Sequence, residues 1–192
     1  MKNYILIASA LLLTCSLTSC KDHLTESKAE EIIKEHQKFP QTDVVTIQYG
    51  LIAFKWDSLP DYYYILQKKG MFNVKYLGTG GFLIINHRFR VTPTKAAEKL
   101  MTKKDDHPRK QGDSGEFMYE SSFKTCEVQF DKIESIHEIP ELNGADVKYI
   151  VKRGNFTPFW SYYLDETKQM PDSVSTHTFG FIKTNKGWIA SR

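Results

Sequence analysis

The spacing of apolar residues divides the chain into a first half with helical periodicity and a second half with strand periodicity. Apolar side chains recur every three to four positions in segments 27–39 and 58–70, which predicts two helices. Thr92-Pro93 is a start signal for a third helix, expected to continue through Met101. Between these segments, β-branched and aromatic residues predict extended chain over 44–56 and 72–91. The second stretch contains a glycine-rich turn and is expected to form a hairpin.

The first predicted helix has the most specific start and stop signals. Ser27 and Glu30 match a capping box, in which the serine hydroxyl and the glutamate side chain satisfy free backbone N–H groups. Phe39 and Pro40 end the periodic run. The sequence therefore predicts a helix that begins at Ser27.

After residue 116 the pattern changes to strict alternation. Apolar side chains at every second position predict antiparallel strands around Cys126–Phe130, Val147–Val151 and His177–Phe181. Residues 102–116 (TKKDDHPRKQGDSGE) are polar and are expected to form a linker or long loop. The predicted class is α+β: a small helical domain at 27–101, followed by an antiparallel β-rich domain at 117–192.

The order helix, strand, helix, hairpin across residues 27–101 resembles the layout of a winged-helix domain. This resemblance rests on element order alone. Winged helices that bind DNA present a basic recognition helix, whereas residues 59–69 carry three tyrosines and only two lysines at the end. If residues 27–101 form a winged helix, we expect its function to differ from DNA binding.

The first twenty residues follow the order of a secretion signal, with Lys2 before a short apolar run. Leu17-Thr18-Ser19-Cys20 then resembles the lipobox of bacterial lipoproteins. The resemblance implies that residues 1–19 are removed and that Cys20 is acylated, with 20–26 as a lipidated tether. Cys15 is the rival position, but it lacks a small residue before it. The alternative is an ordinary signal peptide or an N-terminal anchor helix.

The same resemblance implies a lipid-anchored protein of the cell envelope whose membrane contact is the lipid on Cys20. Lys21 stands where an aspartate would resemble the signal for inner-membrane retention, so the outer membrane is expected. Lys21-Asp22 partly matches the charged motifs of surface-exposed lipoproteins, but His23 interrupts the acidic run. Periplasmic and surface-facing positions both stay open.

Composition limits the partners and the redox chemistry. The chain has 26 basic and 23 acidic residues, and loss of Lys2 with the signal leaves a net charge of +2. So mild an excess, on an exported protein, does not predict nucleic-acid binding. Cys126 would be the last thiol after processing and acylation, and its place on an apolar strand face predicts a buried side chain without a disulfide.

No catalytic or cofactor motif has its full context. Gly112-Asp113-Ser114-Gly115 resembles the nucleophile loop of chymotrypsin-like proteases, but Glu116 replaces the family's third glycine, and a polar loop cannot hold an oxyanion hole. The glycines at 78–81 precede a strand and not the helix of a P-loop. The six histidines are scattered, without a metal-binding pair. We predict no catalytic residue, metal or cofactor.

One aromatic cluster is a candidate binding patch. Phe159, Trp160, Tyr162 and Tyr163 lie within five residues, and Tyr62–Tyr64 form a second cluster. Exposed aromatic faces stack on sugars or peptides, whereas buried ones build a core. The leading hypothesis is a non-enzymatic binding or assembly module with an unknown protein or glycan partner. The alternatives are an envelope hydrolase acting on glycans or peptides, or an accessory subunit of one.

Overall fold

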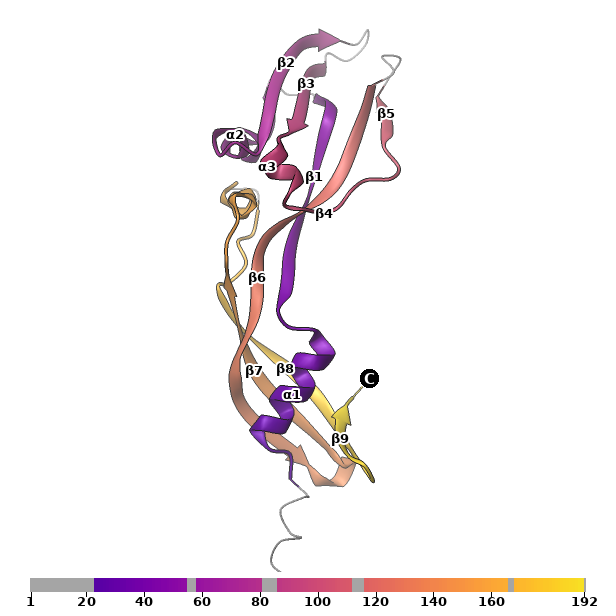
Figure 1. The fold of residues 1–192 in the computed structure, drawn as a ribbon, viewed down its shortest axis with the longest axis vertical. Coiled ribbons are helices and arrows are strands. Elements are labelled where there is room, and N and C mark those ends of the chain that lie inside the picture. The colour runs from indigo at the N-terminus through magenta and orange to yellow at the C-terminus, as the bar shows by residue number, and fades with distance from the viewer. Residues whose placement is uncertain (1–22, 55–57, 81–85, 112–115, 166–167, 192) are drawn as a thin grey trace, which may run out of the picture. The chain divides into compact units, whose positions relative to one another are not determined.

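The computed structural model describes residues 23–54, 58–80, 86–111, 116–165 and 168–191 (Figure 1). Within these ranges, nine strands join one sheet, and each pair of strands with a defined register is antiparallel. The sheet order is β2-β3-β1-β6-β7-β8-β9, and β4 and β5 also pair with β6. The chain is therefore a mostly antiparallel β protein. The predicted α+β class, with a helical winged-helix-like first part, is wrong.

The chain forms two compact units, and neither is a continuous stretch of sequence. The described residues of unit 1 lie within 23–38, 131–150 and 176–191, and those of unit 2 lie within 39–130 and 151–175. Three strands have residues in both units: β6 (Glu116–Ile139), β7 (Gly144–Gly154) and β8 (Val174–Thr184). This division differs from the consecutive domains expected at 27–101 and 117–192.

Unit 2 is centred on β1 (Gln41–Phe54), which pairs with β3 (Asn86–Pro93) on one side and β6 on the other. The hairpin partner of β3 is β2 (Phe72–Gly80). Gly50 has a φ of 93° in the middle of β1, and a Cβ there would overlap the carbonyl oxygen of Phe117. Glycine is the residue that tolerates both this conformation and this close approach.

Two helices and a 3₁₀ segment complete unit 2: α2 (Asp61–Lys68), α3 (Lys95–Glu98) and η4 (Pro158–Leu164). The centre of the core consists of Phe72, Phe123 and Phe159, whose ring centroids lie 4.4–5.8 Å apart. All three are almost completely buried. Burial of such aromatic rings is the main stabilising contribution in a core of this size.

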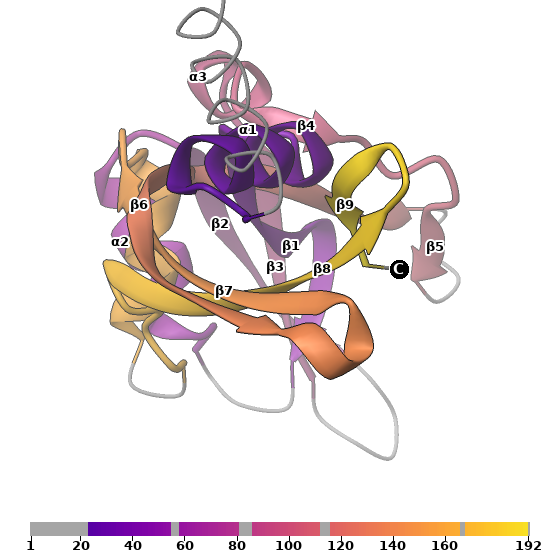
Figure 2. The ribbon, with the colours of Figure 1, turned by 90° about the horizontal axis from the view of Figure 1, so that it is seen from below.

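Unit 1 consists of α1 (Glu26–Gln37) and strands from β6 to β9 (Gly187–Ala190), with η3 (Pro140–Leu142) before β7. Figure 2 shows α1 lying over the curved layer that β7, β8 and β9 form. Ala29 and Ile33 point inward from the helix, and His36 packs edge-to-face on Phe179 at 5.2 Å. The other apolar residues buried in this unit are Leu24, Ala145, Val147, Tyr149 and Phe181.

The winged-helix resemblance fails because element order does not determine which strands pair. The strand expected at 44–56 pairs with β6, a strand from the part of the chain expected to form a separate domain. The third expected helix, 92–101, reduces to the single turn of α3, and Met101 begins β4 (Met101–Lys103). The expected linker also contains β5 (Arg109–Gln111). Segment 102–116 is thus partly ordered by the sheet.

The start of α1 also differs from the capping-box prediction. Thr25 is the N-cap, and its Oγ1 accepts the backbone N–H of Lys28 at 3.3 Å. Ser27 lies inside the first turn. Residues 1–22, which include the predicted signal and the acylation site Cys20, fall outside the described residues. None of the helices in the described ranges has the length and apolar character needed to cross a bilayer.

Candidate functional site

The predicted aromatic patch is divided between core and surface by η4. Phe159 is fully buried at 0% exposure, so it is a core residue and cannot contact a ligand. Trp160, Tyr162 and Tyr163 are partly exposed. Phe156, just before the helix, is 50% exposed and joins them on the surface. Compared with the four residues that the sequence predicts, the exposed patch lacks Phe159 and gains Phe156.

The surface rings form a continuous series, which we call the aromatic row: Phe156, Trp160, Tyr163, Tyr162 and Tyr62. Neighbouring ring centroids along this series are 4.7, 5.2, 5.6 and 4.8 Å apart. The first four rings come from η4 and the residues before it, and the last comes from α2. These spacings fall in the range for direct aromatic contact.

Hydrogen bonds from the backbone and hydroxyl of Thr157 hold the η4 part of the row in place. Thr157 caps η4 by accepting the N–H of Phe159 at 3.2 Å. The same hydroxyl donates to the carbonyl of Lys124, and the N–H of Thr157 donates to the carbonyl of Thr125 at 2.8 Å. Because Lys124 and Thr125 belong to β6, the aromatic row is attached directly to a sheet strand. Such preorganisation lowers the entropy cost of binding.

The tyrosine hydroxyls of the row can act as hydrogen-bond donors at neutral pH, because the ordinary tyrosine pKa is about 10. Burial raises the pKa of Tyr62 further, and burial with the nearby negative charge of Asp43 raises the pKa of Tyr163. The ammonium group of Lys168 lies 5.1 Å from the Tyr162 ring centroid, within cation–π range. The row thus combines aromatic faces with polar edges.

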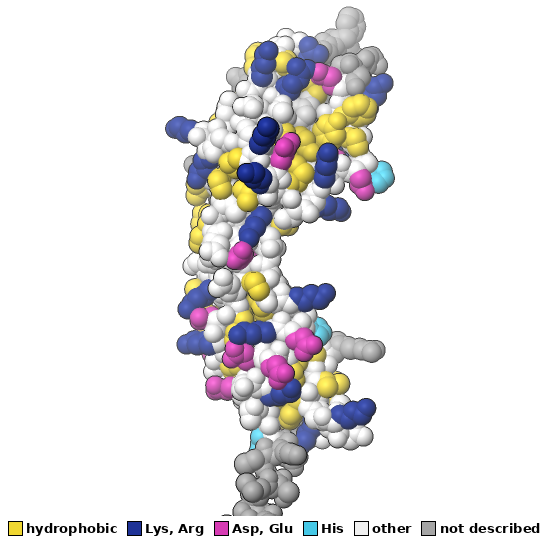
Figure 3. Space-filling model, in the orientation of Figure 1, with side chains coloured by type: hydrophobic (Ala, Val, Ile, Leu, Met, Phe, Trp, Pro, Cys, Tyr) yellow, Lys and Arg dark blue, Asp and Glu magenta, His cyan; other side chains and the backbone are white. Residues whose placement is uncertain are grey.

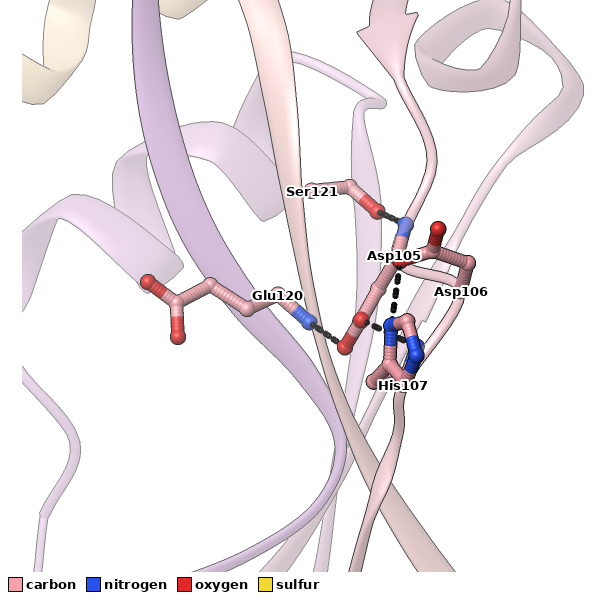
Figure 4. A network of polar contacts seen from close by, with 5 residues as sticks. All are labelled: Asp105, Asp106, His107, Glu120 and Ser121. Carbon is pink, nitrogen blue, oxygen red and sulfur yellow. Dashed lines mark hydrogen bonds and ion pairs between the residues drawn. The ribbon is translucent and has the colours of Figure 1, made fainter.

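A polar hollow of ≈ 400 Å³ lies elsewhere in unit 2, beside β6 and the segment after β4. Asp105 organises it: its carboxylate accepts the backbone N–H of Glu120 at 2.8 Å and that of His107 at 2.9 Å (Figure 4). The N–H of Asp105 donates to Ser121 Oγ at 3.0 Å. Both oxygens of the Asp105 carboxylate are therefore occupied by backbone N–H groups.

The imidazole of His107 pairs with Asp106 at 2.8 Å, and this hydrogen bond lowers the pKa of the Asp106 carboxyl. Both side chains are highly exposed. Among the described residues, no hydroxyl or thiol is hydrogen-bonded to this histidine. A nucleophile, a base and an orienting group are therefore not assembled there, and catalysis by the known arrangements needs all three.

Cys126 has the environment expected of a small buried hydrophobe. Its side chain is buried in β6, and its Sγ lies 3.8 Å from Asp43 Oδ2. Burial raises the pKa of the thiol, so the nucleophilic thiolate is disfavoured. Asp43 is instead paired with Arg153 Nε at 2.8 Å. Cys126 is thus a free, buried cysteine whose side chain packs within the sheet.

The other sequence motifs bring no chemistry together in the described part of the chain. There, no three side chains of the metal-ligating types His, Cys, Asp and Glu gather closely enough to hold an ion. Gly112–Gly115, the protease-like motif, lies outside the described residues. Gly78 and Gly80 end strand β2, and the rest of that turn also lies outside them.

Unit 2 contains a locally basic segment that the composition of the whole chain does not reveal. Between residues 62 and 110 there are eleven lysines and arginines and three acidic residues, although the whole chain has a net charge of only +3. In Figure 3 the basic side chains crowd the part of the molecule that carries β2, β3 and β5. A count by segment reveals this signal, whereas the chain total conceals it. The basic excess is therefore confined to the 62–110 segment of unit 2.

Comparisons of the chain with protein-family models, with curated proteins and with solved structures gave no match.

Proposed function

We propose that this chain is a lipid-anchored binding module of the bacterial cell envelope and that the aromatic row of unit 2 binds a carbohydrate. The observation that carries the proposal is the continuous contact of five partly exposed rings from Phe156 to Tyr62. Tyr62, Tyr162 and Tyr163 are partly buried against the hydrophobic core of unit 2, which fixes their positions. Phe156, at 50% exposure, and Trp160 lie outside that core, and neighbouring exposed aromatic rings are typical of a binding site.

Carbohydrate is favoured over other ligands by the combination of groups in the row. Sugar rings have apolar C–H faces, which stack on aromatic faces, and hydroxyl rims, which need hydrogen-bond partners. The O–H group of Tyr163 supplies such a partner beside the stacking faces. The basic segment 62–110 favours a sugar that carries acidic groups.

The hydrolase alternative has its best location at the hollow near Asp105. It is less well supported because Asp105 is occupied by two backbone N–H groups and Asp106 pairs with an exposed histidine. An accessory role beside a separately encoded enzyme is compatible with the aromatic row. Purified protein assayed on glycans and peptides distinguishes these roles, since only a hydrolase gives turnover that His107→Ala abolishes.

The membrane part of the proposal rests on Leu17-Thr18-Ser19-Cys20 and its resemblance to a lipobox. The lipid on Cys20 would confine unit 2 to the membrane surface. Confinement raises the effective concentration of a binding module near surface-bound ligands. Sugar contacts that are individually weak are then enough to keep the module bound. The envelope location and the modest binding surface are thus mutually consistent.

A glycan array probed with labelled residues 21–192 tests the binding proposal directly. We expect retention of one or more acidic glycans, reduced by added salt. Trp160→Ala should weaken binding at least tenfold, equal to about 1.4 kcal/mol. Tyr76→Ala is the matched control, because Tyr76 is also 50% exposed in unit 2 but packs on His87 outside the row. Equal binding by Trp160→Ala and wild type would contradict the proposal.

A further inference from the structure

The second candidate interaction surface is a groove in unit 1 between α1 and β9. Its volume is ≈ 450 Å³. Figures 1 and 2 show the helix next to this last strand. One wall is a stripe of α1 and the residue that follows its end, and the other wall is the strand itself. The lining residues are Lys28, Ile32, Glu35, His36, Lys38, Trp188, Ile189 and Ala190.

The outer edge of β9 offers unused backbone hydrogen-bonding groups. The N–H of Ser191 donates to the carbonyl of Gly180 at 2.8 Å, so Ser191 faces β8. Because backbone groups alternate in direction along an antiparallel strand, Trp188 and Ala190 face away from β8. Within the described part of the chain, β9 is the last strand of the sheet and pairs with β8 alone.

Side chains give this edge little protection against pairing. Exposed edges are blunted by short length, a charged residue, a proline or a bulge, and Gly187-Trp188-Ile189-Ala190 is short but has none of the other three. Ile189 is instead 49% exposed, and its cross-strand neighbour Ile182 is 42% exposed. The indole N–H of Trp188 is buried without a hydrogen-bond acceptor among the described residues. An additional strand would cover this apolar edge.

The two walls match in length. From Lys28 to His36 the helix rises about 12 Å, and the four residues of β9 extend about 13 Å. Lys38 and Glu35 line the groove, and neither side chain has an ionic partner among the described residues. The groove thus offers a backbone ladder on one side and apolar and charged side chains on the other.

We infer that unit 1 binds an extended peptide, which pairs with the outer edge of β9 and places alternate side chains against the α1 stripe. Main-chain hydrogen bonds to Trp188 and Ala190 supply affinity, and contacts with Ile32 supply a preference for an apolar side chain. This site lies in a different unit from the aromatic row and does not depend on carbohydrate binding.

Selection of a displayed library of random eight-residue peptides on residues 21–192 tests this inference. Enriched peptides should protect the Trp188 and Ala190 amide protons from exchange. Ala190→Pro removes one outward N–H, which proline can replace on an edge strand, and should weaken binding at least tenfold. Ile32→Asp should weaken it similarly through the opposite wall. Leu142→Thr changes a residue of η3 that is 73% exposed and does not line the groove, and this variant should bind normally.

Three results would overturn the inference. The first is a library that yields no peptide sensitive to Ala190→Pro or Ile32→Asp. The second is a selected peptide that binds equally well before and after N-methylation of its alternate backbone amides. An N-methylated peptide cannot form the backbone hydrogen bonds with β9. The third is concentration-dependent dimerisation that protects the same amides without peptide, because the occupant would then be a second copy of this chain.

Discussion

The carboxylate of Asp105 accepts the backbone N–H of Glu120 at 2.8 Å across fifteen residues of sequence. A second oxygen of the same carboxylate accepts the N–H of His107. One side chain thereby fixes the polar segment after β4 to strand β6. The charged segment that sequence patterns assign to a linker is held to the sheet by this acidic group together with the pairing of β5 with β6.

Replacing Asp105 by alanine should lower the free energy of unfolding by about 1–2 kcal/mol, because two backbone donors lose their acceptor at a partly exposed site. Urea denaturation measures the loss, and hydrogen exchange should be faster at the amide of Glu120. Asp106→Ala is the matched control and should leave the free energy of unfolding unchanged, because its side chain is exposed and bonds only to the exposed His107. Equal effects of the two substitutions would refute the anchoring role.

The cap of α1 distinguishes the structure from the sequence prediction. Thr25→Ala removes the hydroxyl that accepts the N–H of Lys28, and should cost about 1 kcal/mol of stability. Ser27→Ala lies inside the helix and should be neutral or slightly stabilising, since alanine has the higher helix propensity. Thermal unfolding of both variants checks the assignment. A larger loss at Ser27 would restore the capping-box prediction.

Acid should loosen the start of the described chain through Glu138. The backbone N–H of Leu24 donates to its carboxylate at 2.8 Å and lowers the pKa of Glu138. A depressed pKa contributes stability above the ordinary glutamate value of about 4.3, and this stability is lost as the pH falls through the lower folded-state pKa.

Glu138→Gln should therefore reduce stability at neutral pH and flatten the loss of stability below about pH 4.3. Unfolding free energies measured from neutral to acidic pH provide the readout. Glu134→Gln alters an exposed carboxylate of the same strand and should leave the slope unchanged. If the unfolding free energy of Glu138→Gln fell with decreasing pH as steeply as that of wild type, the proposed coupling between Glu138 protonation and stability would be excluded.

Lipidation is testable at one residue. Cys20→Ser removes the thiol that would carry the diacylglycerol, so the chain should accumulate as an unprocessed precursor without acyl label. Cys15→Ser removes the rival cysteine and should leave processing intact. Metabolic labelling with a fatty acid, followed by membrane fractionation, checks both. Acylation of the Cys20→Ser variant would disprove the assignment.

Local patterns predicted several elements because their causes are local. Period-two alternation placed Val147, Tyr149 and Val151 on one buried side of β7, and all three are buried. Gly70 follows α2 with a φ of 73°, a conformation that favours glycine. These features depend on neighbours within a few residues, so the sequence reveals them.

The fold and the site depended on contacts that no local pattern contains. Val45 pairs with Phe123 across nearly eighty residues, and this pairing inserts β1 into the sheet and excludes the winged helix. Phe159 and Trp160 are adjacent and equally aromatic, yet η4 turns one into the core and leaves the other partly exposed. Which ring is buried depends on the packing of Phe72 and Phe123, which sequence spacing does not encode.

The interleaving of the two units has a consequence for the time course of synthesis. Helix α1 belongs to unit 1 and leaves the ribosome early, but its partners in that unit, β7, β8 and β9, are made last. Unit 2 lacks residues 151–175 until the same late stage. Neither unit can complete its core while the chain is still short. Each unit can therefore complete its core only after most of the chain has been synthesised.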